Sequence, residues 1–181
     1  MANKRSISCM LCLALIILLL PLQWLLSALA AAFIHELGHY CAVRLLGGSV
    51  QRLQFGTSGA IMEATGLTQR SELVCLLAGP LTGLLSVFAI RIFPTIALCG
   101  IVQSAYNLLP IYPLDGGKML RIIILMAGGT EYSFQLIEHF VLLLLLTLCI
   151  YIKLRFGISL FLFFVILLLR KTPCKPPKDW I

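Results

Sequence analysis

The chain carries a His-Glu-x-x-His pattern, His35-Glu36-Leu37-Gly38-His39, inside a long apolar run. Residues four apart lie on the same face of a helix, so His35 and His39 can direct their ring nitrogens at one ion. That spacing suits zinc, and Glu36 is placed to take a proton from a water molecule that the metal activates. The pattern therefore predicts a hydrolytic zinc site with Glu36 as its catalytic base.

A third ligand is expected downstream, where residues 107–117 (NLLPIYPLDGG) interrupt another apolar run. A catalytic zinc site needs three protein ligands and one open position. Asp115 fits because it is acidic and because the glycines after it let the backbone come close. We expect one zinc ion per chain, held by His35, His39 and Asp115. A helix N-cap role for Asp115 is the alternative, and it is compatible with ligation.

Other polar side chains lie near these motifs. Asn107 is in an apolar run and is predicted to act in catalysis, by donating a hydrogen bond to the oxyanion that develops on an attacked carbonyl. It could equally tie two helices together. Glu138 and His139, near the start of a later apolar run, are expected to form an interfacial, solvated pair.

The composition places this chemistry in a membrane. The 181 residues are 60% hydrophobic and 12% charged, with a mean hydropathy of +1.02, which no ordinary soluble domain shows. Ionisable groups at bilayer depth cost about 2.5–3.5 kcal/mol each on insertion scales, and zinc coordination supplies the compensation. The net charge of +7 does not indicate nucleic acid, because the basic residues lie at the ends of apolar runs.

We therefore predict an all-α polytopic membrane protein that forms a single metalloprotease domain, with no C-terminal regulatory domain. A span needs about 20 apolar residues, and the first predicted span is short. About six transmembrane helices are expected, over residues 7–20, 24–46, 72–93, 95–109, 133–152 and 156–169 of the domain 1–181.

A small β-hairpin is predicted between the second and third spans, with strands at 50–55 and 60–64 around the turn Gly56-Thr57-Ser58-Gly59. A plain connecting loop is the alternative. An exposed edge strand would pair with an extended substrate, which a membrane protease needs because helical substrates shield their carbonyls. The residues expected to contact substrate are Val50, Leu53, Phe55 and Pro110.

Two further features concern packing and orientation. Ala78-Gly79-Pro80 on the third span is expected to pack against the second span, since small residues let helices approach closely.

With the N-terminus inside, eleven of the fourteen Lys and Arg residues are cytoplasmic, as the positive-inside rule requires. We predict a multi-pass protein of the bacterial cytoplasmic membrane with both termini cytoplasmic. No disulfides are assigned to the seven cysteines.

The pairing of His-Glu-Leu-Gly-His at 35–39 with Asn-Leu-Leu-Pro-Ile-Tyr-Pro-Leu-Asp-Gly-Gly at 107–117 resembles the site-2 protease family of intramembrane zinc metalloproteases. It is most similar to the small sporulation-type (stage IV sporulation protein FB-like) branch, over about residues 24–121. The resemblance implies zinc ligands at His35, His39 and Asp115, a base at Glu36 and the family's Asn at Asn107. It also implies cleavage of single-span membrane proteins, typically precursors of transcription or sigma factors, with a membrane regulator or inhibitor as a further candidate partner and no nucleic acid.

The chain departs from the family pattern in two places. Many relatives carry Asn shortly after Ala-Gly-Pro, where this chain has Thr82-Gly83, so the substrate or packing contact made there is not carried over. Sporulation-type enzymes usually carry a C-terminal regulatory domain, and this chain stops soon after its last predicted span. Control through that domain and a sporulation role are therefore not carried over.

Two alternative functions remain open at this point. Membrane zinc proteases that trim prenylated or misfolded proteins also use His-Glu-x-x-His, but their third ligand is a Glu on a later helix. A membrane zinc transporter or metal-dependent scaffold is the non-enzyme alternative. Transport would need further acidic or histidine residues along an exit path, and the predicted spans carry none beyond those named.

Overall fold

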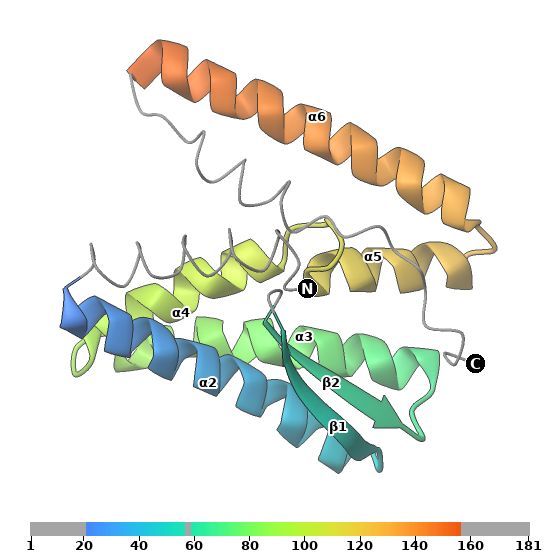
Figure 1. Cartoon of the computed structure of the whole chain (residues 1–181), viewed down its shortest axis with the longest axis horizontal. Helices are drawn as coiled ribbons and strands as arrows, with labels where there is room; N and C mark the ends of the chain where they lie inside the picture. Colours follow the sequence, from blue (N-terminus) through green and yellow to red (C-terminus); the bar gives the residue numbers. More distant parts are fainter. Residues whose placement is uncertain (1–20, 57–58, 157–181) are drawn as a thin grey trace, which may run out of the picture.

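The computed structural model describes residues 21–56 and 59–156 (Figure 1). Within these ranges the chain is mostly helical, with one two-stranded antiparallel sheet. The elements in chain order are α2 (Leu22–Leu45), β1 (Ser49–Gly56), β2 (Gly59–Thr65), α3 (Gln69–Leu85), the short 3-10 helix η1 (Ser86–Ala89), α4 (Pro94–Asn107), α5 (Asp115–Met126) and α6 (Glu131–Phe156).

In the described part of the chain, three helices are long and apolar enough to cross a membrane: Leu22–Leu45, Gln69–Ala89 and Glu131–Arg155. They correspond to the predicted spans 24–46, 72–93 and 133–152. The membrane character and the helical class are therefore confirmed. The predicted span 7–20 lies outside the described residues, as does nearly all of 156–169.

The predicted span 95–109 is a helix, but a short one. α4 has 14 residues, which is about 21 Å of helix against about 30 Å of hydrocarbon. Its length alone does not support a full crossing, so the count of six spans stays a prediction.

Helix α5 is an element that the sequence analysis did not assign. The two glycines after Asp115 suggested a continued break, yet Asp115, Gly116 and Gly117 form its first turn. Leu114 is the N-cap and no side chain caps this helix, so Asp115 does not serve as an N-cap. Its side chain is thereby left available for other contacts.

The β-hairpin is confirmed, and the helix before it ends at two glycines. β1 pairs with β2 from Ser49 opposite Thr65 to Gly56 opposite Gly59. α2 ends in a Schellman motif: Gly47 has φ +80°, and the N–H of Gly48 donates to the carbonyl oxygen of Val43 at 2.9 Å. This turn directs the chain from the end of α2 straight into β1.

Small residues bring α2, α3 and α4 together, and the three helices pack pairwise. A β-carbon on Gly38 would lie 2.4 Å from Oγ1 of Thr82, and one on Gly83 would lie 2.1 Å from Oγ of Ser104. Without a hydrophobic driving force in lipid, such close backbone approach is what stabilises helix pairs. The expected packing of α3 against α2 is confirmed.

Helices α5 and α6 complete the described fold. α5 packs on α3, and α6 packs on α5 and runs along one side of the molecule (Figure 1). Large apolar side chains face outward over the whole surface, among them Phe33, Phe88 and Leu154 at 68%, 83% and 81% exposure. A soluble monomer does not expose so many, whereas lipid-facing helices must.

Candidate metal centre

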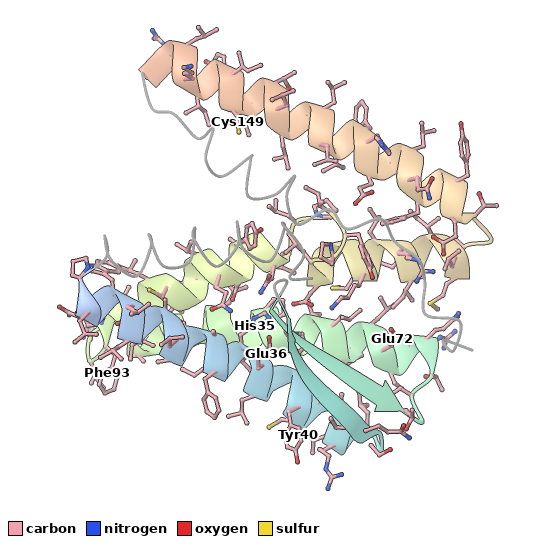
Figure 2. All side chains as sticks on the ribbon, viewed as in Figure 1. His35, Glu36, Tyr40, Glu72, Phe93 and Cys149 are labelled. Carbon is pink, nitrogen blue, oxygen red and sulfur yellow. The ribbon has the colours of Figure 1, made fainter. Side chains whose placement is uncertain are left out.

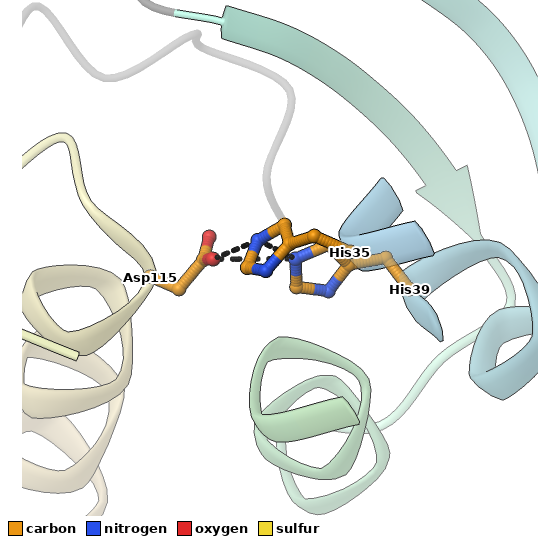
Figure 3. A group of neighbouring side chains, drawn as sticks. All are labelled: His35, His39 and Asp115. Atoms are coloured by element: carbon orange, nitrogen blue, oxygen red, sulfur yellow. Dashed lines mark hydrogen bonds and ion pairs between the residues drawn. The ribbon is translucent and has the colours of Figure 1, made fainter. Parts of the chain in front are cut away.

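Three side chains from two distant segments converge on one point (Figure 3). Nε2 of His35 lies 3.1 Å from Nε2 of His39 and 3.1 Å from Oδ2 of Asp115. Nε2 of His39 lies 3.2 Å from the same carboxylate oxygen. The two histidines come from the middle of α2, and Asp115 comes from the first turn of α5. Within the described residues, this is the group of His, Cys, Asp or Glu side chains suited to hold a metal ion.

The geometry of this triangle fits zinc. A tetrahedral zinc ion with bonds of about 2.0–2.1 Å keeps its ligand atoms about 3.3 Å apart. The separations of 3.1, 3.1 and 3.2 Å are close to that value. His35 is 2% exposed and Asp115 is 8% exposed, so these two donors are largely shielded from bulk solvent. Two imidazole nitrogens and one carboxylate oxygen are the donor set of a catalytic zinc site.

The tautomer of His39 is fixed by α3. Nδ1 of His39 donates to the backbone carbonyl oxygen of Cys75 at 2.7 Å. The proton therefore sits on Nδ1, and the lone pair of Nε2 points at His35 and Asp115. A second hydrogen bond of this kind is how metal-ligating histidines are oriented in proteins. α3 thus prepares one ligand for a cation.

The approach of α3 to His39 depends on Gly79. A β-carbon on Gly79 would lie 2.2 Å from Nε2 of His39. The small-residue step Ala78-Gly79-Pro80 therefore packs against a ligand side chain, and any larger residue at position 79 would displace the ring. This contact links the packing of α2 on α3 to the metal centre.

Asp115 is oriented by the first turn of α5. Its Oδ2 faces the two histidines, and its Oδ1 lies 3.6 Å from Nζ of Lys118, one turn further along the helix. A carboxylate at a helix N-terminus is also stabilised by the helix dipole. The expected close approach of the glycine backbone is present: a β-carbon on Gly116 would lie 2.2 Å from the carbonyl oxygen of Leu108.

Asn107 lies at the rim of the triangle. Its Nδ2 donates to Nε2 of His35 at 3.1 Å, which identifies that nitrogen as an acceptor whose lone pair a cation could take. The amide donor would then be free beside the metal position. Asn107 also joins α4 to α2 through this contact, as the helix-tying alternative expected, and its catalytic role stays a prediction.

Glu36 is half-buried on the same turn of α2 as His35 (Figure 2). The titratable side chains that act on it electrostatically are those of His39, His35, Asp115 and Lys118. Its carboxylate is therefore close to the metal position without belonging to the triangle. This is the arrangement that a general base needs.

The residues predicted to contact substrate are spread over two elements. Val50 on β1 packs against the cluster of Ala42, Val43 and Cys75, so its side chain docks the hairpin onto α2 and α3. The backbones of Leu53 and Phe55 lie on β1, but their side chains lie outside the described residues. Pro110 is half-buried in the loop between α4 and α5.

One residue near the site differs from expectation, and a second makes a contact that the sequence analysis left open. Glu138 was expected to be solvated beside His139, but it is 4% exposed and its Oε1 accepts the backbone N–H of Tyr112 at 3.0 Å; His139 is exposed. The feature of the sequence that could have indicated a buried, hydrogen-bonded Glu138 is its position inside an apolar run. Thr82 donates to the carbonyl oxygens of Gly79 and Ile34 at 2.7 and 3.3 Å, so it makes a packing contact between α3 and α2.

Two curated proteins are similar to this chain in sequence, and one of them is named as a zinc metalloprotease. The chain is 28% identical over 105 residues to a zinc metalloprotease of Methanocaldococcus jannaschii, covering 50% of this chain and 31% of that protein. It is 30% identical over 115 residues to stage IV sporulation protein FB of Bacillus subtilis, covering 55% and 39%. The chain therefore spans between three tenths and two fifths of the length of these relatives. No protein-family model matches the chain.

The fold is similar to that of a solved structure, a site-2 protease from Methanocaldococcus jannaschii. The TM-score is 0.65 at 19% identity, with 92% of this chain and 85% of that chain covered. The chain therefore has the fold of that site-2 protease, and it is similar in sequence to the two relatives over about half of its own length.

Proposed function

We propose that the chain is an intramembrane zinc metalloendopeptidase that hydrolyses a peptide bond in or near the transmembrane segment of a membrane-tethered protein. The observation that carries the proposal is the triangle of His35, His39 and Asp115, with separations of 3.1–3.2 Å, inside a protein of apolar helices. One zinc ion per chain would occupy it. When bound, zinc would polarise the scissile carbonyl and make water a stronger acid.

The protein's own residues supply the proton transfers and the charge stabilisation. Glu36 takes the proton from the attacking water and passes it to the leaving amine. The Nδ2 of Asn107, 3.1 Å from a ligand atom, donates a hydrogen bond to the oxyanion that develops on the attacked carbonyl. Both groups are carried by helices, so their positions are fixed before substrate arrives.

The substrate is a single-span membrane protein. Its helix must be unwound before a carbonyl can be attacked, and the hairpin offers backbone donors and acceptors for the extended form. Val50 anchors that hairpin on α2 and α3; Leu53 and Phe55 are on the same strand. Pro110 would meet substrate from the loop that leads to Asp115. A precursor of a transcription or sigma factor, and a membrane regulator, are the partners that the family resemblance suggests.

The protein is proposed to lie in the bacterial cytoplasmic membrane with both termini in the cytoplasm. With six spans and the N-terminus inside, the distribution of basic residues supports this orientation.

The function is tested with the parent chain and the Glu36→Gln variant, each reconstituted in vesicles with a panel of single-span substrates. The proposal predicts that both bind one zinc ion and that only the parent cleaves. Cleavage by the variant would contradict the role of Glu36. A parent that cleaves no substrate but moves zinc across the vesicle membrane would instead be a transporter.

A further inference from the structure

One face of α6 is buried, and that face contains a carboxylate. Among the residues of α6 whose burial is described, only Phe134, Glu138 and Leu142 are buried, at 4%, 4% and 9% exposure. They are four residues apart and therefore form one stripe along the helix. The rest of α6 is largely exposed, as a lipid-facing helix would be. Glu138 lies at the centre of the only described stripe with which α6 meets the protein.

This stripe contacts the loop between α4 and α5. Leu142 packs against Ile111, which is 1% exposed. The backbone N–H of Tyr112 donates to Oε1 of Glu138 at 3.0 Å. One apolar and one polar contact thus hold adjacent residues of the loop against α6.

The loop connects two groups of the metal centre. It begins directly after Asn107 and ends directly before Asp115. From the other side it is held by the first turn of α5: a β-carbon on Gly117 would lie 2.4 Å from the backbone nitrogen of Tyr112. The nitrogen that Glu138 binds is therefore the same atom against which Gly117 packs, two residues from Asp115.

A carboxylate at this position needs a reason. An acidic side chain at bilayer depth costs about 2.5–3.5 kcal/mol on insertion scales, and such residues are functional by default. An apolar residue would extend the stripe of Phe134 and Leu142 without that cost. What an apolar residue cannot do is accept the N–H of Tyr112, which would then lose this hydrogen bond.

We propose that Glu138 is a positioning residue of the metal centre: by holding the Tyr112 N–H it fixes the 108–114 loop, and so the separation of Asn107 and Asp115 from the histidines of α2. The inference rests on the proposed zinc site. It assigns α6 a role in ligand geometry, although α6 contributes no atom to the triangle.

The test compares four variants with the parent chain in detergent. Glu138→Gln keeps a carbonyl oxygen that can accept the N–H, Glu138→Asp shortens the reach, and Glu138→Leu removes the acceptor. Glu131→Gln, at the exposed start of the same helix, is the matched control. Zinc affinity is measured by competition with a chelator, and site geometry by the visible spectrum of the cobalt-substituted protein.

The expected result is a loss of zinc affinity of about tenfold or more in Glu138→Leu and Glu138→Asp, with a changed cobalt spectrum. Glu138→Gln and Glu131→Gln should match the parent. Far-ultraviolet circular dichroism checks that each variant is folded, and Glu138→Asp decides the matter if Glu138→Leu does not fold.

Two results would overturn the inference. One is parent-like zinc affinity and spectrum in both Glu138→Asp and Glu138→Leu. The other is an equal loss in Glu138→Gln and Glu138→Leu, because the amide retains the acceptor. Both results are distinct from failure of the proposed function, in which the parent itself would bind no zinc or cleave no membrane substrate.

Discussion

The α-carbon of Gly79 lies against the imidazole of His39 so closely that a β-carbon there would come within 2.2 Å of Nε2. A residue of α3 with no side chain thus determines where a ligand of α2 can sit. The neighbouring carbonyl of Cys75, which accepts the Nδ1 proton of His39 at 2.7 Å, completes the hold on the ring. α3 contributes no ligand, yet it fixes both the position and the tautomer of one.

Substitution of Gly79 by Ala should therefore weaken metal binding. The added methyl group must displace the His39 ring or separate α3 from α2, and we expect zinc affinity to fall at least about tenfold. Chelator competition measures the change. Leu81→Ala, at a 46% exposed position on the same helix, is the control and should leave affinity unaltered. Equal affinity in Gly79→Ala and the parent would show that His39 is not a ligand in this geometry.

Asn107→Ala should separate catalysis from metal binding. Removal of one donor to a developing oxyanion costs about 10²–10³ in kcat, while His35, His39 and Asp115 remain to bind zinc. We expect bound zinc to stay at the parent level and the cleavage rate to fall by that factor. A variant that lost zinc and activity in proportion would instead indicate that Asn107 acts only by tying α4 to α2.

Val50→Asp should affect substrate rather than metal. The new carboxylate would lie in the apolar contact with Ala42, Val43 and Cys75. Because that contact packs the hairpin on α2 and α3, the hairpin would be held less firmly against these helices. We expect KM for a single-span substrate to rise about tenfold, equivalent to about 1.4 kcal/mol, with zinc content unchanged. An unaltered KM would argue against binding of substrate at the hairpin.

The ion pair between Arg121 and Glu131 should contribute little. Arg121 donates to both carboxylate oxygens of Glu131, but the Glu131 side chain is 48% exposed, and exposed pairs are worth about 0–1 kcal/mol. Glu131→Gln should lower the free energy of unfolding by less than about 1 kcal/mol in a denaturant titration. A larger loss would mean that this pair, rather than the Glu138 stripe, attaches α6.

Local patterns predicted the half of the site that lies on one helix. His35 and His39 are one helical turn apart, so their convergence depends on helix geometry alone. The partnership with Asp115, eighty residues away, followed from the need of zinc for a third ligand. The Schellman end of α2 at Gly47 and the hairpin were predictable for similar reasons, since each depends on a few adjacent residues.

The two features that the sequence did not predict, helix α5 and the burial of Glu138, depend on tertiary contacts. α5 was not predicted because Gly116 and Gly117 disfavour a helix; here they occupy its first turn because the loop backbone packs directly on them. Glu138 was expected at a solvated interface because it lies near the start of an apolar run. Its burial is set by the rotation of α6 against the loop at Tyr112, which no local pattern encodes.

The most direct test of the proposed metal centre is X-ray absorption at the zinc edge of the purified, zinc-loaded parent protein. The account predicts one zinc ion per chain, surrounded at about 2.0–2.2 Å by two imidazole nitrogens and by oxygen. The spectrum should lose its imidazole contribution in a His35→Ala, His39→Ala double variant. Sulfur neighbours at about 2.3 Å, or an unchanged spectrum in that variant, would contradict the account.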